Sequence, residues 1–351
     1  MTPSESAENG RHLPADHPRV NFGKTGLLLV NLGTPDGTDF WNMRRYLKEF
    51  LWDRRVIETP RILWWLILNG IILNTRPQKS GEAYRRVWNE ELDESPLRTF
   101  TRSQSDQLAE KLQHHQNLVV SWAMRYGNPS IDSKLTELQQ AGCERIVVLP
   151  LYPQYSAATT ATVADKVFDS LKKMRWQPAI RIAAAYHDDD WYIDAICASI
   201  KQHLATQDFE PERILLSFHG VPKAYLDKGD PYHCHCVKTW RLVGERLGMG
   251  PDKLFYAFQS RFGPAEWLQP YTDETLEEWA KSGVKRVTVA MPGFSSDCLE
   301  TIDEMGLENR ELFEENGGTD YEIVPCLNDS ELGMQVIEQL AKRELAGWVA
   351  L

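Results

Sequence analysis

The chain has 351 residues, of which 42% are hydrophobic, and its formal net charge is −11. This length is about twice that of a usual domain and predicts two packed globular domains, while the negative charge, without a dense Lys/Arg stripe, argues against a nucleic-acid partner. Six cysteines, spread thinly through a chain this long, argue against a disulfide framework and indicate a reducing compartment.

The first 24 residues are polar and contain prolines. They lack the apolar core of a secretory signal. We therefore expect residues 1–24 to be a flexible N-terminal tail of a cytoplasmic protein.

Short apolar runs alternate with amphipathic stretches along the rest of the chain. The strand-like runs cover residues 26–32, 119–126, 145–152, 180–186, 213–219, 253–258 and 285–291. Near-continuous Val, Ile and Leu runs of this kind are typical of parallel strands buried on both faces. Helical patterns stand between them at residues 103–112, 161–173 and 191–204. The alternation predicts an α/β fold with two open sheets.

The division between the two domains is expected near residues 180–190, with four of the seven runs before or at it and three after it. The closing helical pattern at 332–345 is expected to pack back on the first domain. After the 1–24 tail, the predicted domains are therefore residues 25–183 with 330–351, and residues 184–329.

Residues 61–73 (RILWWLILNGIIL) are almost wholly apolar and contain two adjacent tryptophans. The segment is well short of the roughly 20 residues that span a bilayer. Two interpretations remain open: a buried helix, or an apolar lip beside a hydrophobic ligand site or a membrane surface. Arg61 and Arg76 flank the segment, as suits an interface with lipid.

His219 ends the apolar run 213–219 and is followed by Gly220. Ligands of open α/β sheets bind at the carboxyl ends of strands, which favours a catalytic or ligand-binding role for His219. The alternative is a structural histidine, the more frequent role of a lone strand-end histidine.

Four acidic residues, Asp297, Glu300, Glu304 and Glu308, are spaced so that they would line one face of a helix. Asp297 and Glu300 also fit an N-cap with a capping-box glutamate. Against that reading, like charges at this spacing repel and need a compensating cation, such as a divalent metal in transit. Together with His219 the row offers nitrogen and oxygen ligands suited to Fe²⁺.

Three further motifs are weaker. HCHC at 233–236 invites a zinc site but has no second ligand pair at the usual spacing. NLGTPDG at 31–37 is not a dinucleotide fingerprint, and Pro35 removes a backbone N–H that a phosphate would need. Ser217 lacks the nucleophile elbow of hydrolases.

The sequence LLSFHGVPKAYLDKGDPY (215–232) closely resembles the ferrochelatase signature, and PGFSSDCLETIDE (292–304) is similar to the second active-site segment of that family. The resemblance covers roughly residues 26–330 and is greatest for the proteobacterial protoporphyrin enzymes. Other matching segments lie at residues 27–35, 43–56, 95–104, 124–131, 149–160 and 258–276.

The resemblance implies two Rossmann-like domains, each with a four-stranded parallel sheet flanked by helices, and a porphyrin in the cleft between them. It implies an enzyme that inserts Fe²⁺ into protoporphyrin IX to form protohaem, the last step of haem biosynthesis. Protoporphyrin IX and Fe²⁺ are then the partners, and the protein is expected to be a monomer.

Matched residue by residue, the resemblance makes His219 and Glu300 the catalytic and metal-binding pair at the macrocycle centre. Glu304 becomes a further metal ligand and Asp297 part of the acidic path that contacts substrate. It leaves open which of His219 and Glu300 is base and which is ligand. The segment 61–73 falls at the apolar lip, which implies peripheral contact with the cytoplasmic face of the membrane. The expected substrate-binding residues of the opposite domain are Arg125, Tyr126 and Tyr152.

Two departures from the family pattern matter. Animal enzymes carry a [2Fe–2S] cluster, but Ala157 stands where they have a cluster cysteine, and no cysteine group precedes Leu351. We therefore expect no iron–sulfur cluster and no permanently bound cofactor. Cys298 replaces a histidine of the animal enzymes, so a role for that ligand is not carried over.

The nearest rival functions are iron insertion into coproporphyrin and cobalt insertion into an early cobalamin precursor. A tetrapyrrole carrier without chemistry is a further alternative, but an anionic, apolar ring gains nothing from carboxylates at its centre. A nucleotide-binding α/β protein is the most distant alternative.

Overall fold

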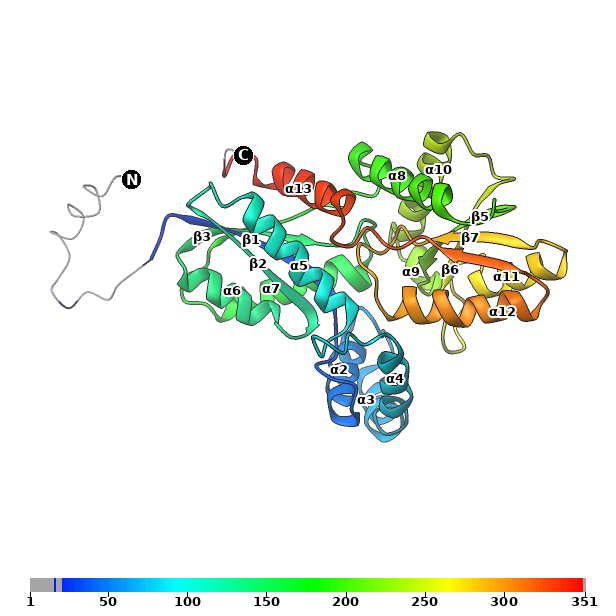
Figure 1. Cartoon of the computed structure of the whole chain (residues 1–351). Helices are drawn as coiled ribbons and strands as arrows, with labels where there is room; N and C mark the ends of the chain where they lie inside the picture. The colour runs from blue at the N-terminus through cyan, green and yellow to red at the C-terminus, as the bar shows by residue number, and fades with distance from the viewer. Residues whose placement is uncertain (1–15, 17–20, 350–351) are drawn as a thin grey trace.

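Two four-stranded parallel sheets form the framework of the protein in a computed structural model that describes residue 16 and residues 21–349 (Figure 1). The first sheet has the order β2-β1-β3-β4 and the second β6-β5-β7-β8. Strands of the first are β1 (Lys24–Thr34), β2 (Leu118–Gly127), β3 (Cys143–Pro150) and β4 (Ala179–Ile182). Strands of the second are β5 (Arg213–His219), β6 (Leu254–Gln259), β7 (Arg286–Ala290) and β8 (Asp320–Ile323). The predicted α/β fold with two parallel sheets is confirmed.

Two differences from the predicted strands have simple causes. The strand β8 matches none of the seven apolar runs, because its sequence DYEI is half polar and only Tyr321 is buried. Strand β1 begins at Lys24, one residue inside the expected tail. The rest of that expected tail lies outside the described residues, apart from residue 16 and residues 21–23.

Both faces of the first sheet are covered, as the unbroken apolar strands predict. On one face Leu27 and Leu29 pack in a cluster with α5 (Pro96–Lys111) and α13 (Glu331–Leu345). On the other, Leu28 and Val30 pack with α6 (Ile131–Gln140) and α7 (Thr162–Lys173), which follows the short π-helix η3 (Ala157–Ala161). Alternating side chains of one strand therefore supply two separate cores.

The second sheet repeats this arrangement. One of its faces packs against α8 (Asp190–Thr206) and α10 (Tyr232–Leu247). The other packs against α11 (Thr272–Lys281), the π-helix η4 (Glu300–Glu308) and α12 (Asn309–Glu315). The short helix α9 (Lys223–Asp227) follows β5.

The closing helix α13 lies between the two halves of the protein, by which we mean the first sheet with its helices and the second sheet with its helices. It contacts α5 and β3 of the first sheet, as expected from the sequence, and also α8. Figure 1 shows α13 and α8 next to each other along one side of both sheets. One cluster of buried side chains extends from the first sheet through α13 and α8 to the second. The division into residues 25–183 with 330–351 and residues 184–329 stays a prediction.

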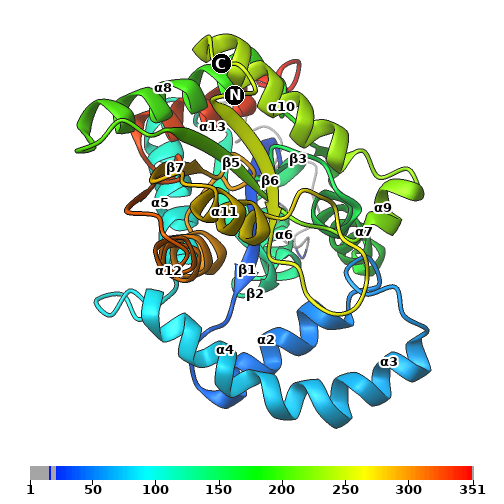
Figure 2. The same cartoon turned by 90° about the vertical axis from the view of Figure 1, so that its right-hand side faces the viewer.

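Three helices, α2 (Phe40–Trp52), α3 (Arg61–Ile67) and α4 (Leu73–Val87), form a separate unit beside the first sheet (Figure 2). The π-helix η2 (Leu68–Ile72) connects α3 to α4 without a break. Their core includes Met43, Trp64 and Leu68. This core continues into the first sheet, because Tyr126 of β2 belongs to the same cluster.

The segment 61–73, which we call the apolar lip, buries only Trp64, Leu68 and Leu73. Five of its large apolar side chains are exposed, among them Ile62 with 83% of its surface accessible. The interpretation as a buried helix is therefore wrong. Among the described residues, no helix is both long and apolar enough to span a bilayer.

A stacked histidine pair ties α10 to the segment before α8. The rings of His187 and His235 are 3.6 Å apart and nearly parallel. The backbone N–H of Tyr155 donates to Nδ1 of His235 at 3.2 Å, so that nitrogen must be unprotonated. Burial and the neighbouring His235 lower the pKa of His187 to about 4, and burial lowers the pKa of His235. Asp188 and Lys238 face the pair, and their opposite charges act on its pKa values in opposite directions.

We expect the protein to lose stability as the pH falls from 6.5 toward about 4. The reason is that the histidines of the unfolded chain become protonated in this range, whereas the lowered pKa values keep the folded pair neutral. The free energy of unfolding should drop by about 2 kcal/mol between about pH 7 and about pH 5. Urea unfolding at both values measures it. His235→Asn, whose amide oxygen still accepts from Tyr155, should flatten the dependence; an unchanged slope in this variant would contradict the assignment.

Candidate active site

Two cavities meet at His219, where the carboxyl ends of both sheets face each other. The larger has a volume of about 640 Å³ and is lined mainly by apolar side chains, including Trp64 of the lip and Trp267 of the second half. The smaller, of about 100 Å³, is lined by residues 31–34, Tyr152 and Glu300. His219 lines both. The larger cavity has the size and apolar character of a site for a small organic molecule.

The imidazole of His219 is held in one tautomer. Its Nδ1 lies 2.6 Å from the carbonyl oxygen of Gly220, and a carbonyl can only accept, so Nδ1 carries the proton. In the neutral imidazole, the lone pair is therefore on the other nitrogen, Nε2. Because β5 ends at His219, the strand delivers a proton acceptor or metal ligand to the junction of the cavities.

Glu300 is the first residue of η4 and lines the smaller cavity together with Tyr84 and Cys298. Burial raises the pKa of the Tyr84 hydroxyl and of the Cys298 thiol, and the negative charge of Glu300 raises both further. Both groups are therefore neutral at ordinary pH, and Glu300 supplies the negative charge at this wall of the cavity.

Glu304 lies behind Glu300 and does not line either cavity. Its carboxylate accepts from the backbone N–H of Ser260 at 2.7 Å and from the amide of Gln259 at 3.4 Å. Burial raises the pKa of Glu304, although Ser260 and His219 act in the opposite direction. A buried carboxyl of raised pKa takes up and releases a proton more readily near neutrality than an exposed one.

The acidic row is not continuous, and the capping box is absent. The segment from Glu300 is a π-helix without a side-chain cap. Asp297 precedes it and instead accepts from Thr301 Oγ1 at 2.8 Å and Asn328 Nδ2 at 2.6 Å. Glu308 lies at the surface near Arg86, at 3.5 Å. Of the four acidic residues Asp297, Glu300, Glu304 and Glu308, only Glu300 lines the two cavities.

The three residues expected on the opposite domain differ in position. Tyr152 lines the smaller cavity, whereas Arg125 and Tyr126 line neither cavity. Both bind the carboxylate of Asp53, Tyr126 at 3.0 Å, and Arg125 also donates to the carbonyl of Thr162 at 2.8 Å. Their contact with substrate stays a prediction.

Sequence reasoning named Tyr152 but missed two other hydroxyls in the smaller cavity, those of Thr34 and Ser295. The side-chain oxygens of Thr34, Tyr152 and Ser295 are buried and have no hydrogen-bond partner among the described residues, and all three residues line this cavity. Buried polar groups without partners mark places where water or a ligand binds. No sequence signal gathers Thr34 and Ser295, because Thr34 ends β1 and Ser295 lies in the loop after β7, far apart in the chain.

Of the three weaker motifs, only NLGTPDG borders the two cavities. Of the cysteines in HCHC, Cys234 is exposed and Cys236 is buried, and within residues 16 and 21–349 no three His, Cys, Asp or Glu side chains are grouped to hold a metal. Ser217 is fully buried and bonds Gln259 and Thr272. Residues 31–34 of NLGTPDG line the smaller cavity.

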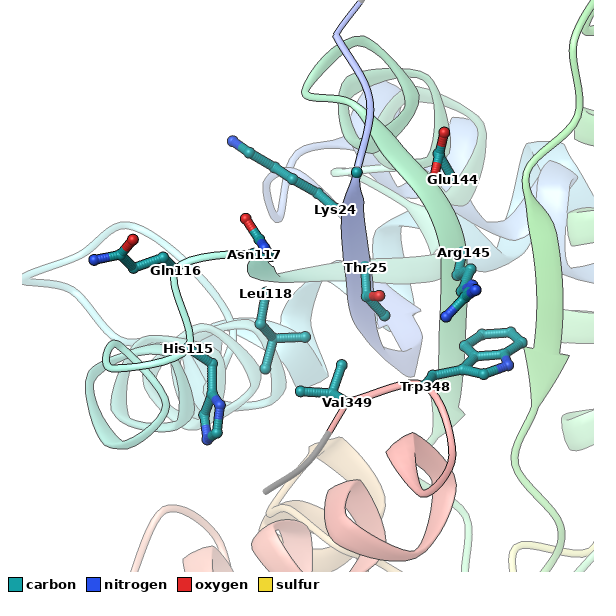
Figure 3. Close-up of a pocket in the computed structure, with 11 residues that line it drawn as sticks. Lys24, Thr25, His115, Gln116, Asn117, Leu118, Glu144, Arg145, Trp348 and Val349 are labelled. Carbon is teal, nitrogen blue, oxygen red and sulfur yellow. The ribbon is translucent and has the colours of Figure 1, made fainter. Parts of the chain in front are cut away.

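A third cavity, of about 400 Å³, opens at the other end of the first sheet, beside the amino ends of β1, β2 and β3 (Figure 3). Lys24, His115, Arg145 and Trp348 are among its lining residues. None of the candidate site residues lies there.

Comparison with known proteins assigns the family. The ferrochelatase family model matches residues 24–345. The chain is 61% identical over 338 residues to a ferrochelatase of Allorhizobium ampelinum, covering 96% of this chain and 98% of the relative. A ferrochelatase of Brucella ovis is 59% identical over 346 residues, covering 99% of this chain and 97% of the relative.

Solved structures support the fold at low sequence identity. A sirohydrochlorin chelatase of Bacillus subtilis subspecies spizizenii matches with a TM-score of 0.52 at 11% identity, covering 93% of this chain and 97% of that one. A multi-domain protein of Deinococcus radiodurans with structural similarity to chelatases also matches with a TM-score of 0.52 at 11% identity. This match covers 91% of this chain and 55% of that one. The match over nearly the whole length at about 60% identity confirms the resemblance seen in the motifs, and the chain belongs to the ferrochelatase family.

Proposed function

We propose that this ferrochelatase inserts Fe²⁺ into protoporphyrin IX at the junction of the two cavities, with His219 and Glu300 as the reacting side chains. Membership of the family makes the chain an enzyme, and haem synthesis by iron insertion is its reaction. The observation that carries the residue assignment is that the free Nε2 of His219 and the carboxylate-bearing Glu300 line the same small cavity.

The chemistry has three requirements. A free-base porphyrin must lose two pyrrole protons, its ring must bend to expose nitrogen lone pairs, and the iron must shed water. The apolar walls of the larger cavity would hold the ring and exclude water. In this scheme Nε2 of His219 accepts a pyrrole proton or holds the entering iron.

The carboxylates serve the metal and the remaining proton. Glu300 would ligate Fe²⁺, for which carboxylate oxygen and imidazole nitrogen are suitable ligands. Glu304, with its raised pKa, would take the proton onward or assist as a ligand. The free hydroxyls of Thr34, Tyr152 and Ser295 are available to water or to polar groups of the substrate. Asp297 is held by Thr301 and Asn328, so we assign it to positioning the start of η4.

A carrier without chemistry is less well supported, because a carboxylate at the cavity wall would repel the anionic ring without serving a metal. Anaerobic incubation of the purified protein with Fe²⁺ and protoporphyrin IX tests the function through the loss of porphyrin fluorescence. Coproporphyrin, and cobalt with a cobalamin precursor, are the comparison substrates. Tight porphyrin binding without turnover would favour the carrier, and faster turnover of another pair would reassign the substrate.

We further propose that the apolar lip contacts the membrane surface. Ile62, Leu63, Trp65, Leu66 and Ile71 are exposed on one short helical stretch. Apolar side chains of this kind bury themselves at the boundary of headgroups and acyl chains. The monomeric state and the absence of a resident cofactor stay predictions.

The double variant Trp65→Ser/Leu66→Ser is expected to weaken binding to vesicles of anionic phospholipid by about tenfold or more, because each buried apolar side chain contributes about 1.5–3 kcal/mol. Sedimentation with vesicles measures this. Trp176→Ser, which removes an exposed tryptophan away from the lip, is the control. Equal vesicle binding by the lip variant and the wild type would contradict the proposal.

A further inference from the structure

The π-helix η4 is attached to the two halves of the protein in unequal ways. From the second half, Ser260 and Gln259 bond Glu304, Gln259 bonds the carbonyl of Glu300, and Tyr321 donates to the carbonyl of Met305 at 2.8 Å. From the first half, within the part of the chain that the structure describes, Arg86 of α4 alone makes hydrogen bonds or ion pairs to η4.

Arg86 meets the middle of η4 with a fork. Its Nε and Nη2 donate to the two carboxylate oxygens of Asp303, both at 2.5 Å. The side chain of Asp303 is only 4% exposed, whereas that of Arg86 is 47% exposed. Hydrogen bonding to Asp303 raises the pKa of Arg86. An exposed ion pair contributes little, but a buried carboxylate that loses its partner is strongly unfavourable.

This contact connects the part of α4 that borders the smaller cavity to the part of η4 that borders it. Tyr84, two residues before Arg86 on α4, lines the smaller cavity with Glu300. Leu299, directly before η4, packs into the core of the α2–α4 unit. Leu299 and the Arg86–Asp303 pair therefore hold the start and the middle of the segment that carries Glu300 against the α2–α4 unit.

A π-helix needs such support. Its hydrogen bonds span five residues, it is rare, and it occurs mostly as single turns at functional sites. Here it runs for nine residues. Without a tertiary contact at Asp303, the wide turns have less to prevent them from relaxing toward an α-helix, and Glu300 would then change its direction relative to His219.

We propose that Arg86 is a positioning residue for iron insertion, which sets Glu300 by clamping Asp303 of the π-helix to the lip-bearing unit. The inference rests on the proposed function of Glu300 but concerns residues that touch neither the porphyrin cavity nor the metal. The inference also predicts in which direction the removal of Arg86 changes the use of Fe²⁺. A purely electrostatic role for Arg86 would make its removal favour Fe²⁺ binding, whereas a positioning role makes removal unfavourable.

The test compares R86Q, D303N and the double variant R86Q/D303N, which removes the ion pair without leaving a buried charge alone. Each is expected to lower kcat/KM for Fe²⁺ by about tenfold, while KM for protoporphyrin IX stays within about twofold. The double variant should be no worse than the single variants, because all three remove the same contact. R310Q is the matched control: it removes a charge from α12, next to η4, but Arg310 pairs with Glu322 of β8.

Hydrogen–deuterium exchange of the peptide covering residues 299–309 supplies a second readout that does not need turnover. Faster exchange in R86Q and D303N, but not in R310Q, supports the clamp even if the wild type proved inactive and the proposed function failed. Wild-type Fe²⁺ kinetics and wild-type exchange in R86Q would overturn the inference. Tighter use of Fe²⁺ in R86Q, or an equal loss in R310Q, would overturn it in favour of a general electrostatic effect.

Discussion

His219→Ala is expected to reduce iron insertion by about 10²–10⁴-fold, the range typical of a lost general base. The variant removes the nitrogen lone pair that the hydrogen bond to Gly220 leaves free in the cavity. Porphyrin affinity should change little, because the apolar lining of the larger cavity comes from many other residues. Single-turnover rates under anaerobic conditions measure the chemistry, and fluorescence titration measures porphyrin binding.

His233→Ala is the matched control for this variant. His233 lies on α10, stacks on Phe258 at 5.8 Å and lines neither cavity of the candidate site, so its loss should leave turnover close to that of the wild type. Partial recovery of His219→Ala by added imidazole would place the role in the ring nitrogen. Turnover by His219→Ala above about a tenth of the wild-type rate would contradict a general-base role of this size.

Glu300→Gln is expected to lower iron insertion by at least about 100-fold, which corresponds to about 2.7 kcal/mol of transition-state stabilisation. Glutamine keeps the shape of the side chain but removes the charge that attracts Fe²⁺ and balances it during entry. Protoporphyrin should still bind, and more tightly if the carboxylate repels the anionic ring. Steady-state kinetics in Fe²⁺ and in porphyrin separate these effects.

A second readout distinguishes charge from packing. Because the negative charge of Glu300 raises the pKa of the Cys298 thiol, Glu300→Gln should make that thiol easier to ionise, and alkylation against pH reports the change. Glu311→Gln removes a charge from the exposed side of α12 and should alter neither property. Full activity of Glu300→Gln would exclude Glu300 as the metal ligand and direct attention to Glu304.

Several features follow from the sequence alone. Unbroken Val, Ile and Leu runs predicted parallel strands buried on both faces, since only that environment accepts apolar side chains in both directions. Strand β5 has the bounds predicted for it, so His219 was correctly placed at a strand end. The ferrochelatase motifs identified the family because short, specific segments around His219 and Glu300 occur in the family order.

Other features were decided only by tertiary structure. The spacing of Asp297, Glu300 and Glu304 predicted one helical face, but the segment from Glu300 forms a π-helix, and Asp297 turns to Asn328. Periodicity could not reveal this, because it assumes the hydrogen bonding of an α-helix. The apolar lip had two open interpretations, since composition records how apolar a segment is and not which of its side chains the neighbouring helices cover.

The pair of Arg86 and Asp303 shows the physical reason most clearly. The two residues are 217 positions apart in the chain, yet they form a forked ion pair. Local propensity and periodicity act over a few turns of chain, and they predicted seven of the eight strands and the helices that overlap residues 103–112, 161–173, 191–204 and 332–345. Contacts such as this one depend on how elements far apart in the chain pack against one another. Such packing brings α4 to η4 beside Glu300, covers one side of the lip with α2 and α4, and groups the hydroxyls in the smaller cavity.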